Sequence, residues 1–315
     1  MNKRIYSGGL VLSVLMLAGI LTVSCTKTDK DAAASGGKLS VITTTGMIAD
    51  AAKNIGGDLI EVTALMGAGV DPHLYKASAK DVDRLGKASL ILYGGLHLEG
   101  KMTDVLEKLG QRKPTLAVAE EIPDDKLIGS NGQGSHDPHV WFDVKLWMYA
   151  VDAVRDSLIA LLPDEDEALR ANYDAYAAQL SALDEYIRKR TAELPQEKRL
   201  IITAHDAFEY FGRAYGFEVR GLQGISTVSE AGTRDVQDLA EFIVRGKIPA
   251  IFVESSVPRK NVEALQAAVH SRGWDVQIGG ELFSDAMGDT GTVEGTYVGM
   301  LKHNIDTIVS ALSAD

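Results

Sequence analysis

Several features that would direct a protein to other functions are missing from this chain. It has one cysteine, Cys25, so a disulfide framework is excluded. Acidic residues outnumber basic ones by 44 to 32, and no block of lysine and arginine occurs. Because binding to a phosphate backbone requires a concentrated positive surface, we expect no nucleic-acid partner. The apolar run over residues 9–23 is shorter than the ~20 residues that a membrane-spanning helix needs.

That apolar run follows Lys3 and Arg4, an arrangement typical of an export signal, so we predict a signal peptide over residues 1–24. The run leads to Cys25 through the sequence LTVSC, which resembles the lipobox of bacterial lipoproteins except that Thr22 replaces the usual leucine. We therefore predict that a lipid on Cys25 anchors the protein to the membrane on the periplasmic, extracytoplasmic side. The alternative is a cleaved signal peptide that leaves a soluble periplasmic protein with an unmodified cysteine.

The next segment, residues 25–37, contains lysine, aspartate, alanine, serine and glycine with almost nothing apolar after the cysteine. This composition predicts a lipidated, flexible tether between the anchor and the folded part, which begins near Lys38. The chain of 315 residues is long enough for two lobes that each bury a core.

Short apolar runs alternate with helical patterns along the rest of the chain. The apolar runs cover residues 39–43, 89–93, 200–203, 250–254 and 276–279, and helical spacing follows at residues 46–55, 206–215 and 260–270. Strands that alternate with helices are typical of parallel sheets covered by helices on both faces. The predicted fold class is α/β, with two lobes that each have a mostly parallel central sheet.

One segment differs, because residues 163–195 carry apolar side chains three or four positions apart with no glycine or proline in the interior. We predict one helix of about 30 residues and about 45 Å there. Such a helix is better explained as a rigid connection between two lobes than as an ordinary surface helix, which is the alternative. The predicted domains are an N-terminal metal-binding lobe over residues 38–162, this linking helix, and a C-terminal metal-binding lobe over residues 196–315.

Two of the seven histidines occur in the same tripeptide, as Asp71-Pro72-His73 and Asp137-Pro138-His139. Aspartate is a good helix N-cap and proline suits a first helical turn, so each histidine is predicted at a rigid helix start. Such a frame suits a metal ligand, because imidazole binds only when its ring nitrogen is aimed and fixed.

His205 follows the strand over residues 200–203, at the carboxyl end where ligand sites of parallel sheets gather. Asp285 lies in a loop after the strand over residues 276–279 and can reach the same cleft. Three neutral imidazoles and one carboxylate would satisfy a four-coordinate divalent ion, whose affinity should weaken below about pH 6 as the rings become charged. Spacing alone leaves open that each histidine is a hydrogen-bonded structural residue.

At these residues the chain resembles the metal-binding receptors of ABC transporters, the solute-binding lipoproteins for zinc and manganese. The resemblance covers nearly all of the chain from Lys38 onward and is most specific in DPHVWFD and GGELFSDAMG. Other matching stretches are ITTTGMIADAAKNI, MGAGVDPHLYKAS, LILYGGLHLE, TAHDAFEYFGRAYGFEV, GLQGIST, IFVESSVP and GTVEGTYVGM.

The resemblance implies two α/β lobes joined by one long helix, with the transported ion between them. It also implies the ligands, which are His73 and His139 from the N-terminal lobe and His205 and Asp285 from the C-terminal lobe. The expected function is capture of Zn²⁺ or Mn²⁺ by a monomer and delivery to the membrane permease of an ABC transporter.

Metal identity is expected to depend on His205, because manganese-specific relatives tend to have glutamate there and zinc receptors histidine. The loop over residues 124–135 lacks the histidine-rich insertion that zinc-specific relatives often carry, which weakens an assignment to zinc alone. We expect both ions to bind, zinc more tightly. Neither His97 nor His136 is predicted to be a ligand: His97 is expected beside the site or on the surface, and His136 in a solvated loop.

Two rival functions belong to other classes. In a zinc hydrolase, Glu254 is a conceivable base, but catalytic zinc keeps a coordination position open and a fourth protein ligand closes it. We therefore expect no enzymatic activity. A role as a surface adhesin is the second rival, and no repeat array or exposed aromatic stripe in the sequence supports it.

Overall fold

The computed structural model describes residues 37–129 and 136–313. The predicted signal peptide, Cys25 and all but the last residue of the predicted tether lie outside the described residues. Within these ranges, no helix is both long and apolar enough to pass through a bilayer.

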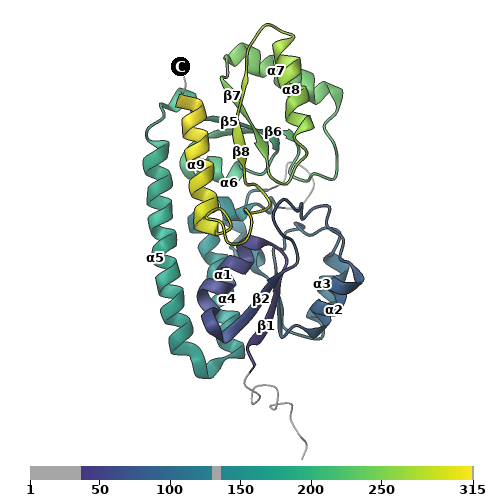
Figure 1. Cartoon of the computed structure of the whole chain (residues 1–315), viewed down its shortest axis with the longest axis vertical. Helices are drawn as coiled ribbons and strands as arrows, with labels where there is room; N and C mark the ends of the chain where they lie inside the picture. Colours follow the sequence, from purple (N-terminus) through teal and green to yellow (C-terminus); the bar gives the residue numbers. More distant parts are fainter. Residues whose placement is uncertain (1–36, 130–135, 314–315) are drawn as a thin grey trace, which may run out of the picture. The chain divides into compact units, whose positions relative to one another are not determined.

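The first half is built on a four-stranded parallel sheet (Figure 1). Its strand order is β2-β1-β3-β4, so the order reverses between the central strands β1 and β3. Val41 pairs with Val62 on one side and with Leu90 on the other, which buries the centre of β1. The strands are β1 (Leu39–Thr43), β2 (Ile60–Ala64), β3 (Leu90–Tyr93) and β4 (Thr115–Ala117), and the helices are α1 (Gly46–Gly56), α2 (Ala79–Lys87), α3 (Thr103–Gly110) and α4 (Val144–Leu161).

The second half has two parallel strand pairs, β5-β6 and β7-β8, and the inner strands β5 and β7 lie side by side. The strands are β5 (Leu200–His205), β6 (Glu218–Gln223), β7 (Ala250–Glu254) and β8 (Gln277–Leu282). The helices are α6 (Glu209–Tyr215), α7 (Thr233–Gly246), α8 (Lys260–His270) and α9 (Tyr297–Ser313). The predicted α/β class with parallel sheets and covering helices is confirmed in both halves.

The linking helix is shorter than predicted. A 3-10 turn at Pro163–Glu165 precedes α5, which covers Asp166–Thr191 and has 26 residues, or about 39 Å. Leu162 adopts φ −128° and ψ 59°, outside the helical region, because the proline ring that follows disfavours a helical conformation there. The helix packs against α1 and α4 of the first half and against α6 and α9 of the second, so it supports both halves (Figure 1).

The two halves also share one hydrophobic core. Trp147 of α4 stacks on Tyr297 of α9 with ring centroids 5.8 Å apart, and the buried Tyr297 hydroxyl donates to the carbonyl of Trp141. Residues Lys38–Asp315 form one compact unit by their contacts. The lobe boundaries proposed after residues 162 and 195 therefore stay a prediction.

Candidate metal centre

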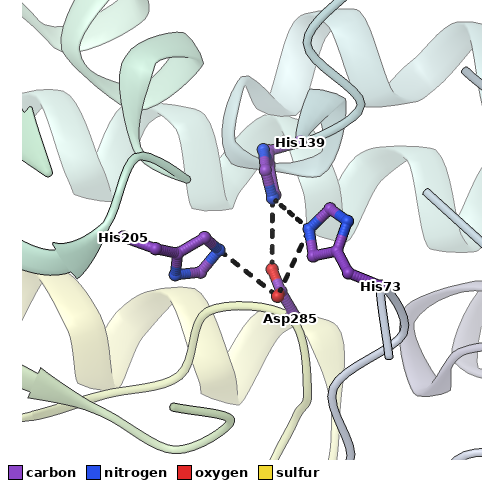
Figure 2. A group of neighbouring side chains, drawn as sticks. All are labelled: His73, His139, His205 and Asp285. Carbon is purple, nitrogen blue, oxygen red and sulfur yellow. Dashed lines mark hydrogen bonds and ion pairs between the residues drawn. The ribbon is translucent and has the colours of Figure 1, made fainter. Parts of the chain in front are cut away.

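Four side chains that are far apart in the sequence meet at the junction of the two halves. His73 lies in the loop after β2, and His139 directly precedes a 3-10 turn, Val140–Phe142, that leads into α4. His205 is the last residue of β5, and Asp285 lies in the loop after β8. Figure 2 shows the three rings and the carboxylate pointing toward one another.

The ligand atoms of these side chains all lie within 4.8 Å of one another. Asp285 is the common partner, because its carboxylate oxygens are 3.3 Å from Nε2 of His139, 3.3 Å from Nε2 of His205 and 3.8 Å from Nε2 of His73. The Nε2 atoms of His73 and His139 are 3.4 Å apart. One nitrogen of each ring and one carboxylate therefore face a single point.

This point is removed from solvent. His139 and His205 are 0% exposed, Asp285 is 1% exposed and His73 is 3% exposed. Nε2 of His205 and both oxygens of Asp285 have no hydrogen-bond partner of good geometry among the described residues. Buried polar atoms normally find a partner, so this group of unpaired donors and acceptors fits a ligand that binds all of them.

The two DPH tripeptides do not start α-helices, which corrects the prediction from sequence. Asp71 and Asp137 instead accept a hydrogen bond from the main-chain N–H of the histidine two residues later, at 2.8 Å for His73 and 2.9 Å for His139. Aspartate makes such local turns as readily as it caps helices, so the sequence signal fits both outcomes. The result is still a rigid frame for each histidine.

Two further buried carboxylates orient the rings from behind. Oδ1 of Asp137 is 2.7 Å from Nδ1 of His139, and Oε2 of Glu254 is 2.6 Å from Nδ1 of His205. Oε1 of Glu254 also accepts the main-chain N–H of His205 at 2.8 Å. A carboxylate at Nδ1 keeps the proton there and leaves Nε2 free to bind metal. Neither orienting role is predicted from the sequence, which indicates a helix cap for Asp137 and only the base of a rival enzyme for Glu254.

The pKa values of the three histidines shift in different directions. Burial lowers the pKa of His73 to about 3, which keeps that ring neutral. Burial also opposes the charged form of His139, but Asp137 and Asp285 outweigh it and raise its pKa to about 9. The pKa of His205 rises well above its usual value, since Glu254 and Asp285 outweigh burial. The metal-free centre therefore holds protons on two rings that a metal ion would have to displace.

The other two histidines considered from the sequence lie apart from this group. His97 is exposed, as expected, in the segment after β3. His136 is partly exposed, and its Nε2 lies 3.7 Å from a carboxylate oxygen of Asp124. Both line a separate pocket in the first half.

The chain is similar over most of its length to proteins named for metal binding. The zinc-binding protein TroA of Treponema pallidum is 60% identical over 285 residues, which cover 90% of this chain and 92% of TroA. The solved structure described as the periplasmic zinc-binding protein TroA from Treponema pallidum matches with a TM-score of 0.86 at 59% identity, over 88% of this chain and 99% of that chain.

Two further relatives are named for manganese. The manganese-binding lipoprotein MntA of Bacillus subtilis is 50% identical over 304 residues, 96% of this chain and 99% of MntA. PsaA of Streptococcus anginosus, a manganese ABC transporter substrate-binding lipoprotein, is 33% identical over 308 residues, 96% of this chain and 98% of PsaA. The family model for ZnuA, the periplasmic component A of the zinc-uptake complex, matches residues 41–311. The chain therefore belongs to the ZnuA family, whose members are metal-binding receptors of ABC transporters.

Proposed function

We propose that this protein captures one divalent transition-metal ion, zinc or manganese, outside the cytoplasm and delivers it to the membrane permease of an ABC transporter. The proposal rests on the convergence of three buried imidazoles and one buried carboxylate whose ligand atoms lie within 4.8 Å of one another. His73, His139, His205 and Asp285 are the proposed ligands. A divalent ion with three neutral rings and one carboxylate keeps a net charge of about +1.

The donor set suits both candidate ions. Imidazole nitrogen and carboxylate oxygen bind zinc in four-coordinate sites, and a carboxylate that binds through both oxygens gives manganese the higher coordination number that it accepts. The general affinity order favours zinc over manganese. Relatives named for zinc and relatives named for manganese both match this chain, which is consistent with binding of either ion.

A receptor explains the centre better than a hydrolase does. Catalytic zinc sites keep one coordination position for water, whereas four protein ligands are available here. Glu254, the conceivable base of the rival enzyme, is already engaged by the main chain and Nδ1 of His205. We therefore propose that the protein has no enzymatic activity.

Release of the ion is proposed to follow a local rearrangement at the junction. Asp71, which orients His73 through one carboxylate oxygen, accepts a hydrogen bond from the Thr227 hydroxyl at 2.6 Å through the other. Thr227 belongs to the segment between β6 and α7 in the second half. Breaking this link frees the His73 loop without moving the shared core, so a small displacement is enough to open the centre.

The cellular context is part of the proposal. We propose that Cys25 is acylated and anchors a monomer to the membrane through the tether over residues 25–37. The names of MntA and PsaA, both lipoproteins, support an anchored, extracytoplasmic receptor with a permease partner. The proposed domains are an N-terminal lobe over residues 38–162, a linking segment over residues 163–195 and a C-terminal lobe over residues 196–315.

One experiment tests the function as a whole. The protein is purified from its native membrane without chelators, its metal content is measured, and zinc is titrated against manganese. We expect close to one transition-metal ion per chain and displacement of manganese by zinc. A metal-free protein that takes up neither ion would contradict the proposal.

A further inference from the structure

Trp141 of the first half holds the segment of the second half that carries Asp285. Its indole Nε1 donates to the main-chain carbonyl of Ser284, the residue before Asp285, at 3.1 Å. Trp141 follows His139 by two positions, and its ring packs edge-on against the His139 imidazole with centroids 5.3 Å apart. One buried side chain therefore joins two proposed ligands that come from opposite halves.

The segment before Asp285 is also fixed from within the second half. Asn304 of α9 accepts the main-chain N–H of Phe283 at 2.9 Å and donates to the Phe283 carbonyl at 2.7 Å. The hydroxyl oxygens of Ser284 and Ser256 are 2.8 Å apart. These bonds leave the Ser284 carbonyl, which accepts the indole N–H, little freedom to move.

The linked pair has the spacing of two ligands on one ion. Nε2 of His139 lies 3.3 Å from Oδ1 of Asp285. Two ligands of a tetrahedral zinc ion with bonds of about 2.0 to 2.1 Å are about 3.3 to 3.4 Å apart. Nε2 of His205 is also 3.3 Å from the Asp285 carboxylate, but these two residues belong to the same half. His139 needs a link across the junction to keep this spacing.

We propose that Trp141 is a positioning residue, which keeps His139 and Asp285 at ligand spacing across the junction and thereby slows release of the ion. This inference rests on the proposed function. Trp141 acts on Asp285 through the main chain of Ser284 and is not itself a ligand. A site whose ligands are fixed in place loses less freedom on binding, so it holds its ion longer.

The test compares two tryptophans that differ in this bond. Trp147 is 2% exposed like Trp141 and belongs to the same core, but its Nε1 has no hydrogen-bond partner among the described residues. Trp141→Phe shortens the ring and removes the link, whereas Trp147→Phe makes a similar truncation without losing a hydrogen bond. Zinc release from the full chain is followed by stopped-flow mixing with excess chromophoric chelator, and the association rate and the free energy of unfolding are measured alongside.

Trp141→Phe is expected to release zinc about tenfold faster than the unmodified protein, the effect of losing one buried hydrogen bond, with little change in the association rate. Trp147→Phe is expected to release zinc at nearly the unmodified rate. A merely structural role of Trp141 lowers the free energy of unfolding in both variants and leaves their release rates alike. Equal release rates in the two variants would overturn the positioning role.

A second variant covers the case in which Trp141→Phe does not fold. Benzothienylalanine in place of tryptophan keeps the ring shape and has sulfur where the N–H was. It is introduced into a Trp274→Phe protein, because Nε1 of Trp274 donates to the carbonyl of Ile248. Of the two remaining tryptophans, only Trp141 then loses a hydrogen bond among the described residues.

This protein is expected to release zinc about tenfold faster than Trp274→Phe with ordinary tryptophan, because the same hydrogen bond is lost. An unchanged rate would overturn the positioning role and leave the proposed function intact, since zinc is still bound. An unmodified protein that binds no zinc would instead contradict the proposed function, and the positioning role falls with it.

Discussion

Replacing Glu254 with glutamine tests how strongly the carboxylate behind His205 controls metal binding. The carboxylate accepts the main-chain N–H of His205 at 2.8 Å and lies 2.6 Å from its Nδ1. An amide of the same shape can still accept the main-chain N–H, but it no longer presents a negative oxygen that keeps the proton on Nδ1. The ring can then place its proton on Nε2, the atom that faces Asp285 and the ion.

We expect Glu254→Gln to weaken zinc binding by about 10- to 100-fold, the usual effect of removing a carboxylate behind a histidine ligand. That range corresponds to about 1.4 to 2.8 kcal/mol. The assay is competition for zinc against a chromophoric chelator at pH 7.5. The matched control is Glu263→Gln, since Glu263 pairs with Arg259 on the surface of α8. A Glu254→Gln affinity within twofold of the unmodified protein would refute the proposed orientation of the ring.

Four further outcomes are expected. The pKa of His139 is raised to about 9 from 6.5, and that of His205 is also raised, so zinc affinity should rise steadily from pH 6 to 9. The loss of affinity on acidification therefore begins at a higher pH than the value of about 6 expected from the sequence. Zinc titration with proton-release measurements checks this. Protonated His139 stabilises the metal-free protein fully below pH 6.5, and this stabilisation is lost as the pH rises through 9. The melting temperature of the metal-free protein should therefore fall over that window, and the rise in melting temperature on adding zinc should grow. Equal rises at pH 6 and pH 9 would count against this account. Thr227→Val removes the 2.6 Å bond to Asp71 and should speed zinc release in stopped-flow exchange by up to about tenfold, and an unchanged rate would exclude the link as a restraint. Tyr297→Phe loses a buried hydrogen bond between the halves and should lower the free energy of unfolding by about 1 to 3 kcal/mol in urea without removing zinc binding; unaltered stability would show that the bond is dispensable.

Much of the fold could be predicted because its strands are short, apolar and punctuated by helical patterns. The predicted strand over residues 250–254 and helix over residues 260–270 coincide with β7 and α8. The predicted helix over residues 206–215 begins three residues late, at Glu209. Ala207 and Phe208 are fully buried before that helix starts, so tertiary packing overrides the local helical pattern.

The candidate site was predictable only in part, because the partners that orient its side chains include residues that are distant in the sequence. The four side chains could be named from the sequence, and the structure brings them together, but their role as ligands stays a prediction. The partners of their rings were harder to find, because Glu254 and His205 lie on neighbouring strands and are 49 positions apart in the sequence. A single sequence does not show how such strands pair. Asp137, by contrast, is two residues before His139, so its turn can be predicted from the local sequence.

The central claim is that His73, His139, His205 and Asp285 bind one ion together. Anomalous X-ray scattering from crystals of the zinc-loaded protein tests it most directly. We predict that the strongest zinc peak lies about 2.0 to 2.2 Å from the Nε2 atoms of the three rings and from the Asp285 carboxylate. A strongest peak elsewhere, with these four side chains bonded only to one another, would contradict the account.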